Sequence, residues 1–196
     1  MKLAFAVATL SLLVFSVSAG RAQGQISGQD STSSADSSYS DFSEKEDCIL
    51  NYERSCSERN IDRFAELFQT DCEFIYIIGK PDSDASVLPN EMLRKHNLQK
   101  ELEATGQLFA GARELRFEIE NGTWTRLDSL SGNPCSDCWE TTRGYSLSAT
   151  FPASGEGEEP HVMSGHGHMK FIVSPVDGKW KILRHIDQPI DKKGDQ

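Results

Sequence analysis

The strongest constraint on this chain is the alternation of apolar and polar residues in its C-terminal half. The alternation runs through three segments, 115–119, 145–151 and 169–173. A period of two places every second side chain on the same face of a β-strand. At residues 176–179, the pair Asp177-Gly178 is typical of a tight hairpin, so the following segment KWKILRHID is predicted to fold back as the last strand. We therefore expect long antiparallel strands, each with one apolar face.

The first of these segments changes its pattern at its end. After Asn121 and Gly122, the apolar Trp124 stands on the opposite parity, as a β-bulge would produce. Asn121 also begins an Asn-Gly-Thr sequon, which matches a glycosylation acceptor if the source is eukaryotic.

Helical spacing dominates the part of the chain before the strands. Ser43 and Glu46 match a capping box ahead of a helix over 44–57, and a second, shorter helix is predicted over 61–68. The apolar run 72–78 reads as a buried strand. A third helix is predicted over 89–105, with Pro89 in its first turn and Gly106 beyond its end.

This order of elements predicts the fold class. Helices come first and a long antiparallel run follows, which favours an α+β fold over a parallel α/β fold. We expect a curved antiparallel sheet packed against three N-terminal helices.

The beginning of the chain has the layout of a cleavable secretory signal. Lys2 precedes an apolar run from Leu3 to Val17, and small residues follow, so residues 1–22 are predicted to be removed after export. The Ser-rich segment 23–42 is too polar to bury a core and is expected to be a disordered linker. Residues 43–190 form one predicted domain and 191–196 a polar tail. The expected location is secreted or periplasmic, without membrane attachment after cleavage.

The net charge argues against some partners. The whole chain carries a formal charge of -10, and removal of Lys2 and Arg21 with the signal leaves 18 basic and 30 acidic residues, or -12. Such a surface repels nucleic acid and anionic lipid.

Histidines near the C-terminus raise two chemical hypotheses. His166 and His168 are two apart and can bind a metal with His161, His185 or Asp187 as a third ligand, but a solvated strand face explains them better. His185 and Asp187 share one face of the last strand and can form an imidazole held by a carboxylate, as acid-base catalysis requires. The alternative is that both cap the end of the sheet in water. We predict no metal and no cofactor.

The five cysteines fit an oxidising compartment. Cys135 and Cys138 are predicted to form a local disulfide in a loop, the alternative being half of a metal clasp. Cys48 and Cys56 lie too far apart on one helix to pair. Cys72 can meet Cys56 across the short helix.

Two segments carry a resemblance to a known superfamily. YERSCSERNIDRFAELFQTDCEFIY (52–76) and DGKWKILRHID (177–187) resemble the opening and closing elements of nuclear transport factor 2-like proteins, which include SnoaL-like cyclases, ketosteroid isomerase and scytalone dehydratase. The resemblance implies a cone-shaped, cystatin-like domain with an apolar pocket at its open end, often in a homodimer.

The resemblance also implies site residues. Tyr52 is similar in position to the isomerase tyrosine that polarises a carbonyl, and Tyr76 stands where that family's carboxylate base is expected. Catalytic candidates are therefore His185, Asp187, Tyr52 and Tyr76. The candidates for lining the ligand pocket are Tyr52, Tyr76, Trp124, Tyr145 and His168. The alternative for each of the four aromatic residues is that it is simply part of the core, which is the better expectation for any single one.

Three functions follow from these observations. The leading one is an exported domain that binds a small apolar or aromatic molecule without catalysis, because no carboxylate matches the family base. The second is a cofactor-free lyase or isomerase that uses tyrosine and histidine residues. The third is a protein-interaction module that uses the face of the sheet.

Overall fold

The computed structural model describes residues 39–77, 93–153, 155 and 158–190. The helices are α1 (Lys45–Ser57), α2 (Ile61–Glu66) and α3 (Leu98–Gly111). The strands are β1 (Phe68–Ile77), β2 (Leu93–His96), β3 (Glu114–Ile119), β4 (Thr125–Leu130), β5 (Asn133–Phe151), β6 (His161–Val176) and β7 (Lys179–Pro189). None of the helices in these residues is both long enough and apolar enough to span a membrane.

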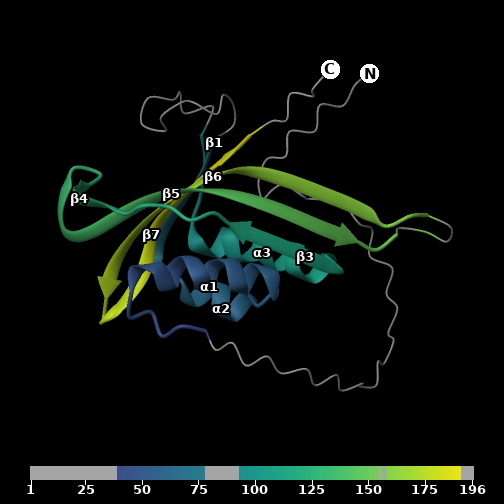
Figure 1. The fold of residues 1–196 in the computed structure, drawn as a ribbon, viewed down its shortest axis with the longest axis horizontal. Coiled ribbons are helices and arrows are strands. Elements are labelled where there is room, and N and C mark those ends of the chain that lie inside the picture. Colours follow the sequence, from purple (N-terminus) through teal and green to yellow (C-terminus); the bar gives the residue numbers. More distant parts are fainter. Residues whose placement is uncertain (1–38, 78–92, 154, 156–157, 191–196) are drawn as a thin grey trace.

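One seven-stranded sheet curves over the helices, which lie together on one side of it (Figure 1). Its strand order is β2-β1-β7-β6-β5-β3, and β4 pairs with the first part of β5. The predicted α+β class and the curved sheet against helices are confirmed. The sheet is mixed rather than wholly antiparallel, because β1 pairs with β7 in parallel. A sequence pattern of period two is the same for both directions, so it did not reveal this pair.

Helix α1 begins as predicted, with a different cap. Glu44 is the N-cap residue, and it forms a capping box with Asp47 in place of the predicted pair Ser43 and Glu46. The Glu44 backbone N–H donates to Asp47 Oδ2 at 2.9 Å. The side chain of Glu46 is instead paired with Arg143 of β5.

The predicted bounds of the third helix are wrong. Within 89–105, residues 93–96 form the edge strand β2, and α3 runs from Leu98 through Gly106 to Gly111. Asn97 caps it by accepting a hydrogen bond from the backbone N–H of Lys100 at 3.0 Å. The N-cap chemistry of Asn97 therefore set the start, while Pro89 lies outside the described residues.

The predicted extra residue before Trp124 is confirmed by the register, since Ile119 pairs with Tyr145 and Thr125 with Glu140, so six steps along this side stand opposite five along β5. The irregularity interrupts the strand, because β3 ends at Ile119 and β4 begins at Thr125. The chain passes beside β5 between the part that pairs with β3 and the part that pairs with β4. Gly122 lies against β5 here, where an added Cβ would be 2.9 Å from Arg143 Cγ. The segment between β3 and β4 thus comes so close to β5 that residue 122 has no room for a side chain.

Two hairpins organise the strands β4 to β7. The predicted turn between β6 and β7 is confirmed, with positive φ angles at Asp177 (51°) and Gly178 (78°). Ser131 and Gly132 make a second such turn between β4 and β5, with φ angles of 53° and 82°. Positive φ at both central residues is the type I′ geometry that matches strand twist.

The core lies between the sheet and the helices and is largely aromatic. Tyr52 of α1 has its ring centroid 5.3 Å from that of Phe64 and 5.3 Å from that of Phe171. Phe117 lies 5.7 Å from the same ring, centroid to centroid. These side chains are fully buried, so the hydrophobic contacts of the helices with the sheet are centred on Tyr52.

The last residues of the expected linker pack against the helices and the sheet. Within the expected linker 23–42, Phe42 is only 5% exposed and its carbonyl accepts from the backbone N–H of Trp180 at 3.0 Å. Ser40 N–H donates to Asn51 Oδ1 at 3.0 Å. Phe42 therefore anchors this end of the chain to β7, and Ser40 anchors it to α1. The predicted signal segment 1–22 and tail 191–196 lie outside the described residues.

A partly buried ion pair joins α1 to β5, in which the Glu46 side chain is 42% exposed. Arg143 has a side chain that is 3% exposed, and it donates to both carboxylate oxygens of Glu46 at 2.7 Å. These hydrogen bonds are the largest cause of the lowered pKa of the Glu46 carboxyl group.

Removing the Glu46 carboxylate would leave the buried Arg143 charge without its partner. We expect Glu46→Ala to lower the free energy of unfolding by about 2 kcal/mol, because the buried guanidinium keeps its desolvation cost. Urea denaturation measures this change. The exposed pair Arg116–Glu118 is the matched control, and Glu118→Ala should cost less than about 0.5 kcal/mol. Equal small losses in both variants would show that the Arg143 pair does not hold α1 to the sheet.

Candidate functional site

Ionisable side chains from six elements meet inside the fold, on the face of the sheet that packs against the helices. His185 and Asp187 lie on this face of β7, two residues apart. In the parallel register, Phe74 of β1 is the neighbour of His185, and Tyr76 is the neighbour of Asp187. Adjacent strands are about 4.8 Å apart, so Tyr76 and Asp187 lie side by side.

Asp187 is the carboxyl group at the centre of this cluster. It is 3% exposed, and the Tyr145 hydroxyl of β5 donates to its Oδ1 at 3.0 Å. Burial raises the pKa of Asp187 to about 7, and the nearby Glu101 carboxylate adds to the rise, while the Tyr145 hydrogen bond opposes it. The carboxyl group therefore changes its charge near neutral pH.

A glycine makes the contact of Tyr145 with β7 possible. Tyr145 pairs with Gly167 of β6, and β6 separates β5 from β7 in the sheet. An added Cβ at Gly167 would be 2.8 Å from Tyr145 Cε1 and 2.6 Å from the Gln188 carbonyl oxygen. The absence of a side chain at Gly167 thus lets the Tyr145 ring reach across β6 to Asp187.

A second carboxyl group enters from α3. Glu101 is 1% exposed, and its two oxygens accept from the Tyr76 hydroxyl and, at 3.3 Å, from the Thr105 hydroxyl. His96 Nδ1 lies 3.5 Å from Glu101 Oε2. Burial, followed by the charge of Lys100, lowers the pKa of His96, although Glu101 opposes this. Two acids therefore share the interior, each held by a tyrosine.

His185 has different surroundings. Its ring is 1% exposed and lies 5.1 Å from Phe171, 5.6 Å from Tyr52 and 5.8 Å from Phe74, measured between centroids. Burial lowers the pKa of His185 to about 3. Neither ring nitrogen has a hydrogen-bond partner within the described residues. The predicted imidazole held by Asp187 is therefore not formed, because the two residues share a face but not a contact.

The structure divides the predicted site residues into two groups. Tyr52, Tyr76, Tyr145, His185 and Asp187 come together in the interior. Two others do not. Trp124 lies beside the start of α1, where its indole N–H donates to Glu46 at 2.8 Å. His168 is exposed, on the face of β6 opposite to that of Met169.

Sequence reasoning missed Glu101, Thr105 and His96. Glu101 and Thr105 are four residues apart on α3 and are both buried with Leu108. Residues four apart share one face of a helix, so a helix started at the Asn97 cap would have shown an acid within its apolar stripe. The misplaced helix start hid this signal.

No group of three histidine, cysteine or acidic residues that could hold a metal is present in the described parts of the chain. His166 and His168 both belong to β6. His185 belongs to β7 and is buried in the core, on the side of the sheet that faces the helices. The alternation of side chains across a strand thus separates the proposed ligands.

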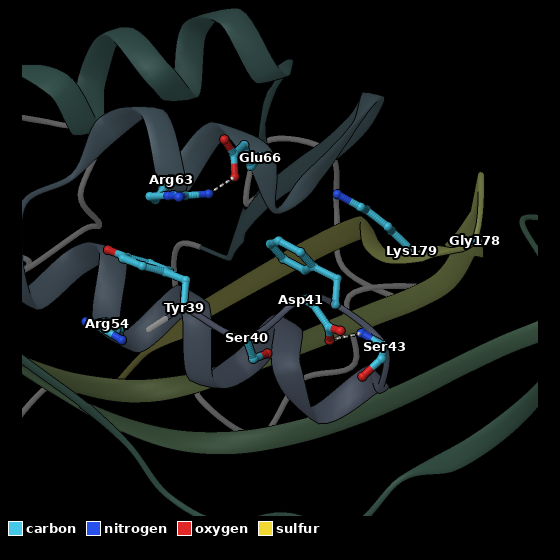
Figure 2. A pocket seen from close by; sticks show the side chains of 10 residues that line it. Tyr39, Ser40, Asp41, Ser43, Arg54, Arg63, Glu66, Gly178 and Lys179 are labelled. Atoms are coloured by element: carbon cyan, nitrogen blue, oxygen red, sulfur yellow. Dashed lines mark hydrogen bonds and ion pairs between the residues drawn. The ribbon is translucent and has the colours of Figure 1, made fainter. Parts of the chain in front are cut away.

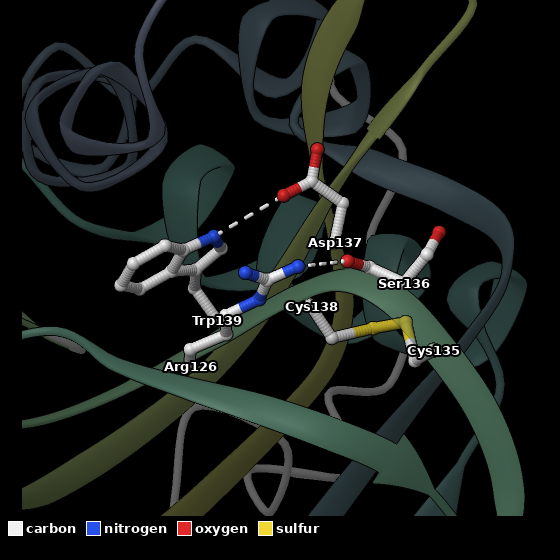
Figure 3. The surroundings of a disulfide bond; sticks show 6 residues. All are labelled: Arg126, Cys135, Ser136, Asp137, Cys138 and Trp139. Atoms are coloured by element: carbon white, nitrogen blue, oxygen red, sulfur yellow. Dashed lines mark hydrogen bonds between the residues drawn. A yellow bond between two sulfur atoms is a disulfide. The ribbon is translucent and has the colours of Figure 1, made fainter.

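The predicted disulfide Cys135–Cys138 is confirmed, and it lies within the first part of β5 rather than in a free loop (Figure 3). Its Cα atoms are 5.6 Å apart. The step from Leu127 to Ser129 in β4 spans two residues, while their partners Cys138 and Pro134 in β5 are four apart. The two extra residues form a bulge that the disulfide closes.

The other three cysteines, Cys48, Cys56 and Cys72, are free and buried. The suggested pairing of Cys56 with Cys72 is therefore wrong. Burial raises the pKa of Cys48 to about 12, so this thiol stays protonated and unreactive.

An open cavity of about 650 Å³ lies elsewhere, between the segment before α1 and the turn that contains Gly178 (Figure 2). The Cζ atoms of Arg54 and Arg63 lie over the Tyr39 ring there, 4.5 Å and 5.2 Å from its centroid respectively. Both arginines are paired, with Glu58 and Glu66 respectively. No predicted site residue lines this cavity, so it is not the candidate site.

Comparison with known proteins identifies the fold. No known family profile matches the sequence, and neither does any curated protein. Solved structures do match. The Kfla4162 protein from Kribbella flavida has a TM-score of 0.56 at 11% identity, covering 75% of this chain and 88% of that protein. A cystatin-like-fold protein from Caulobacter vibrioides has a TM-score of 0.52 at 11% identity, with coverage of 75% and 87%.

A third match has a functional description. It is a proposed dehydratase of the NTF2-like family from Streptomyces avermitilis, with a TM-score of 0.50, 10% identity and coverage of 74% of this chain and 92% of that one. The chain therefore has the cystatin-like fold of nuclear transport factor 2-like proteins, as the sequence resemblance implied. At these identities, the likeness concerns the fold.

The buried pair His185 and Asp187 predicts an unusual pH dependence of stability. The pKa of Asp187 is raised from 3.8 to about 7, so its stabilising contribution is present below pH 3.8 and is lost as the pH rises through 7. The pKa of His185 is lowered from 6.5 to about 3, so its contribution is present above pH 6.5 and is lost as the pH falls towards 3. Between about pH 4 and 6.5 the two slopes cancel, because the pair binds one proton in both states.

Each single substitution should expose the slope of the other residue. As the pH rises from 4.5 to 6.5, we expect the free energy of unfolding of His185→Leu to fall by about 2 kcal/mol relative to that of the unchanged protein, because only Asp187 then contributes a slope. Asp187→Asn should gain a similar amount over the same interval, through His185. Urea denaturation at the two pH values measures both. Parallel pH profiles for all three proteins would contradict the assigned pKa values.

Proposed function

We propose that the protein is a cofactor-free lyase or isomerase that uses Asp187 as its general base on a small apolar or aromatic molecule. The observation that carries this proposal is the Asp187 carboxyl group, buried, held by the Tyr145 hydroxyl and with its pKa raised to about 7. A base works best when its pKa lies near the working pH. Buried acids with strongly shifted pKa values are concentrated at catalytic sites.

The reaction begins with a proton transfer. The Asp187 carboxylate takes a proton from a carbon next to a carbonyl group, and the C–H electron pair moves towards the carbonyl oxygen. In an isomerase, the Asp187 carboxyl returns the proton at another carbon. In a lyase, the electron pair returns to form a carbon–carbon double bond and expels a leaving group from the neighbouring carbon, and the Asp187 carboxyl group gives its proton to that leaving group. Neither route requires a redox partner.

The tyrosines supply hydrogen bonds. Burial, followed by nearby Cys56, Glu101, Tyr76 and Asp187, raises the pKa of Tyr52 well above its usual range, so Tyr52 stays a protonated donor. A phenol that donates to an oxygen where negative charge develops lowers the barrier. Tyr76 lies next to Asp187 in the sheet and serves the same role once it turns from Glu101.

In this proposal, His185 lines the site and does not take part in proton transfer. A neutral imidazole with a pKa of about 3 gives up no proton at neutral pH. Its neighbours Tyr52, Phe74 and Phe171 are aromatic and suit an apolar or aromatic substrate. Because all these groups are closely packed, the substrate must displace side chains to reach Asp187.

The comparison with known structures adds a consistent example. The Streptomyces avermitilis protein of the same fold is described as a proposed dehydratase, and dehydration is a lyase reaction. A shared fold alone does not assign an activity, so the proposal depends on Asp187.

Proton exchange tests the proposal before the substrate is known. In D2O, the protein should catalyse hydrogen–deuterium exchange at the α-carbon of some members of a panel of small aryl and cyclic ketones, followed by NMR. We expect Asp187→Asn to reduce the exchange rate at least about 100-fold, the range for loss of a general base. His168→Gln, on the outer face, should leave the rate unchanged.

The pH profile gives a second, more specific measurement. The exchange rate should rise with pH around a midpoint near 7, because Asp187 must be ionised. Tyr145→Phe removes the hydrogen bond that stabilises the ionised form, so the midpoint should move upwards. Ketones that stabilise the protein against heat but undergo no exchange would contradict catalysis and support a binding protein instead.

We also propose that the protein acts outside the cytoplasm. The support is the apolar run after Lys2 and the Cys135–Cys138 disulfide, a bond that persists in oxidising compartments. Intact mass spectrometry of the full-length gene product expressed in cells should find the exported form without residues 1–19 or 1–22. Recovery of only the uncleaved chain inside the cells would contradict export.

A further inference from the structure

All three tryptophans of the protein surround one lysine, away from the Asp187 cluster. Trp124 precedes β4, Trp139 belongs to β5 and Trp180 belongs to β7. The Lys45 ammonium lies 4.5 Å from the ring centroid of Trp139, and 6.0 Å from those of Trp124 and Trp180. An ammonium within about 6 Å of an indole face is attracted by the ring quadrupole. We call these three rings the tryptophan cage.

Acidic side chains hold two of the rings by accepting hydrogen bonds from their indole groups. The Trp124 indole N–H donates to Glu46 at 2.8 Å, and the Trp139 indole N–H donates to Asp137 at 3.4 Å (Figure 3). Arg143 also lies 5.5 Å from the Trp124 centroid, but its charge is paired with Glu46. The cage is thus a prepared site for a cation.

Lys45 is a weakly held occupant of this site. It is the first residue of α1, where the helix dipole is positive and repels a cation. Its ammonium is compact and strongly hydrated, so it gains solvation when it moves into water. Lys45 is only half-buried, and it can leave the cage without moving the helix.

We propose that the tryptophan cage binds an alkylated ammonium group of an external ligand, with Lys45 as the internal occupant that this group displaces. Methyl groups make such a cation larger and less hydrated than the Lys45 ammonium, so the same rings bind it more strongly. The formal charge of -10 favours approach of a cation.

Tetramethylammonium chloride is the probe for this site, with sodium chloride at equal ionic strength as reference. Because every tryptophan of the chain belongs to the cage, tryptophan fluorescence, excited selectively over that of the tyrosines, reports on the cage. We expect a saturable change in the unchanged protein and binding about tenfold tighter in Lys45→Gln, which lacks the competing ammonium. Trp139→Leu should weaken binding at least about tenfold, and Trp139→Phe, which keeps an aromatic face, should weaken it less.

Lys179→Gln is the matched control, because it removes the same charge from an exposed residue outside the cage. Its affinity for the probe should equal that of the unchanged protein. Equal tightening in Lys45→Gln and Lys179→Gln would overturn the proposal by showing a general charge effect. A non-saturable response in Lys45→Gln, or the same response to sodium chloride, would also overturn it. If Trp139→Leu fails to fold by circular dichroism, Trp139→Phe provides the comparison.

Discussion

The parallel pairing of β1 with β7 is the constraint on which the interior of this protein depends. This pairing joins β1, which follows α2, to β7 near the C-terminus. The strands therefore form one curved sheet with the helices packed on one face. The same register places Tyr76 beside Asp187 and Phe74 beside His185. Because β5 and β6 continue the ladder from β7, Tyr145 reaches Asp187 past the bare backbone of Gly167. The candidate site is therefore a product of strand order.

The interior combines two environments that affect ionisable groups differently. Asp187 and Glu101 each accept a hydrogen bond from a tyrosine, so their polar atoms are satisfied although they are buried. His185 is surrounded by aromatic rings and has no such partner within the described residues. The imidazole is therefore neutral over a wide pH range, and the carboxyl group of Asp187 titrates near neutrality. This difference assigns the proton chemistry to Asp187 and the apolar wall to His185.

Much of the fold was predictable because it depends on local spacing. The strand alternation, the Asp177-Gly178 hairpin, the first helix and the Cys135–Cys138 disulfide are all encoded within a few neighbouring residues. The errors arose where local signals competed. Pro89 suggested an early helix start, whereas the Asn97 cap set the actual one. The misplaced helix start hid Glu101 within the apolar face of α3. The change of parity at Trp124 did mark one extra residue between β3 and β4.

The α+β class, the faces of the strands and the shared face of His185 and Asp187 follow from the order of the residues, because side-chain direction depends on the period of a strand or helix. Which groups meet, and how they ionise, depends on the folded chain. A hydrogen bond from Tyr145 to Asp187, or a ring of aromatic side chains around His185, joins residues that are far apart in the chain. The pKa of a buried group depends on these distant neighbours and on its exclusion from water, and neither is encoded in local spacing.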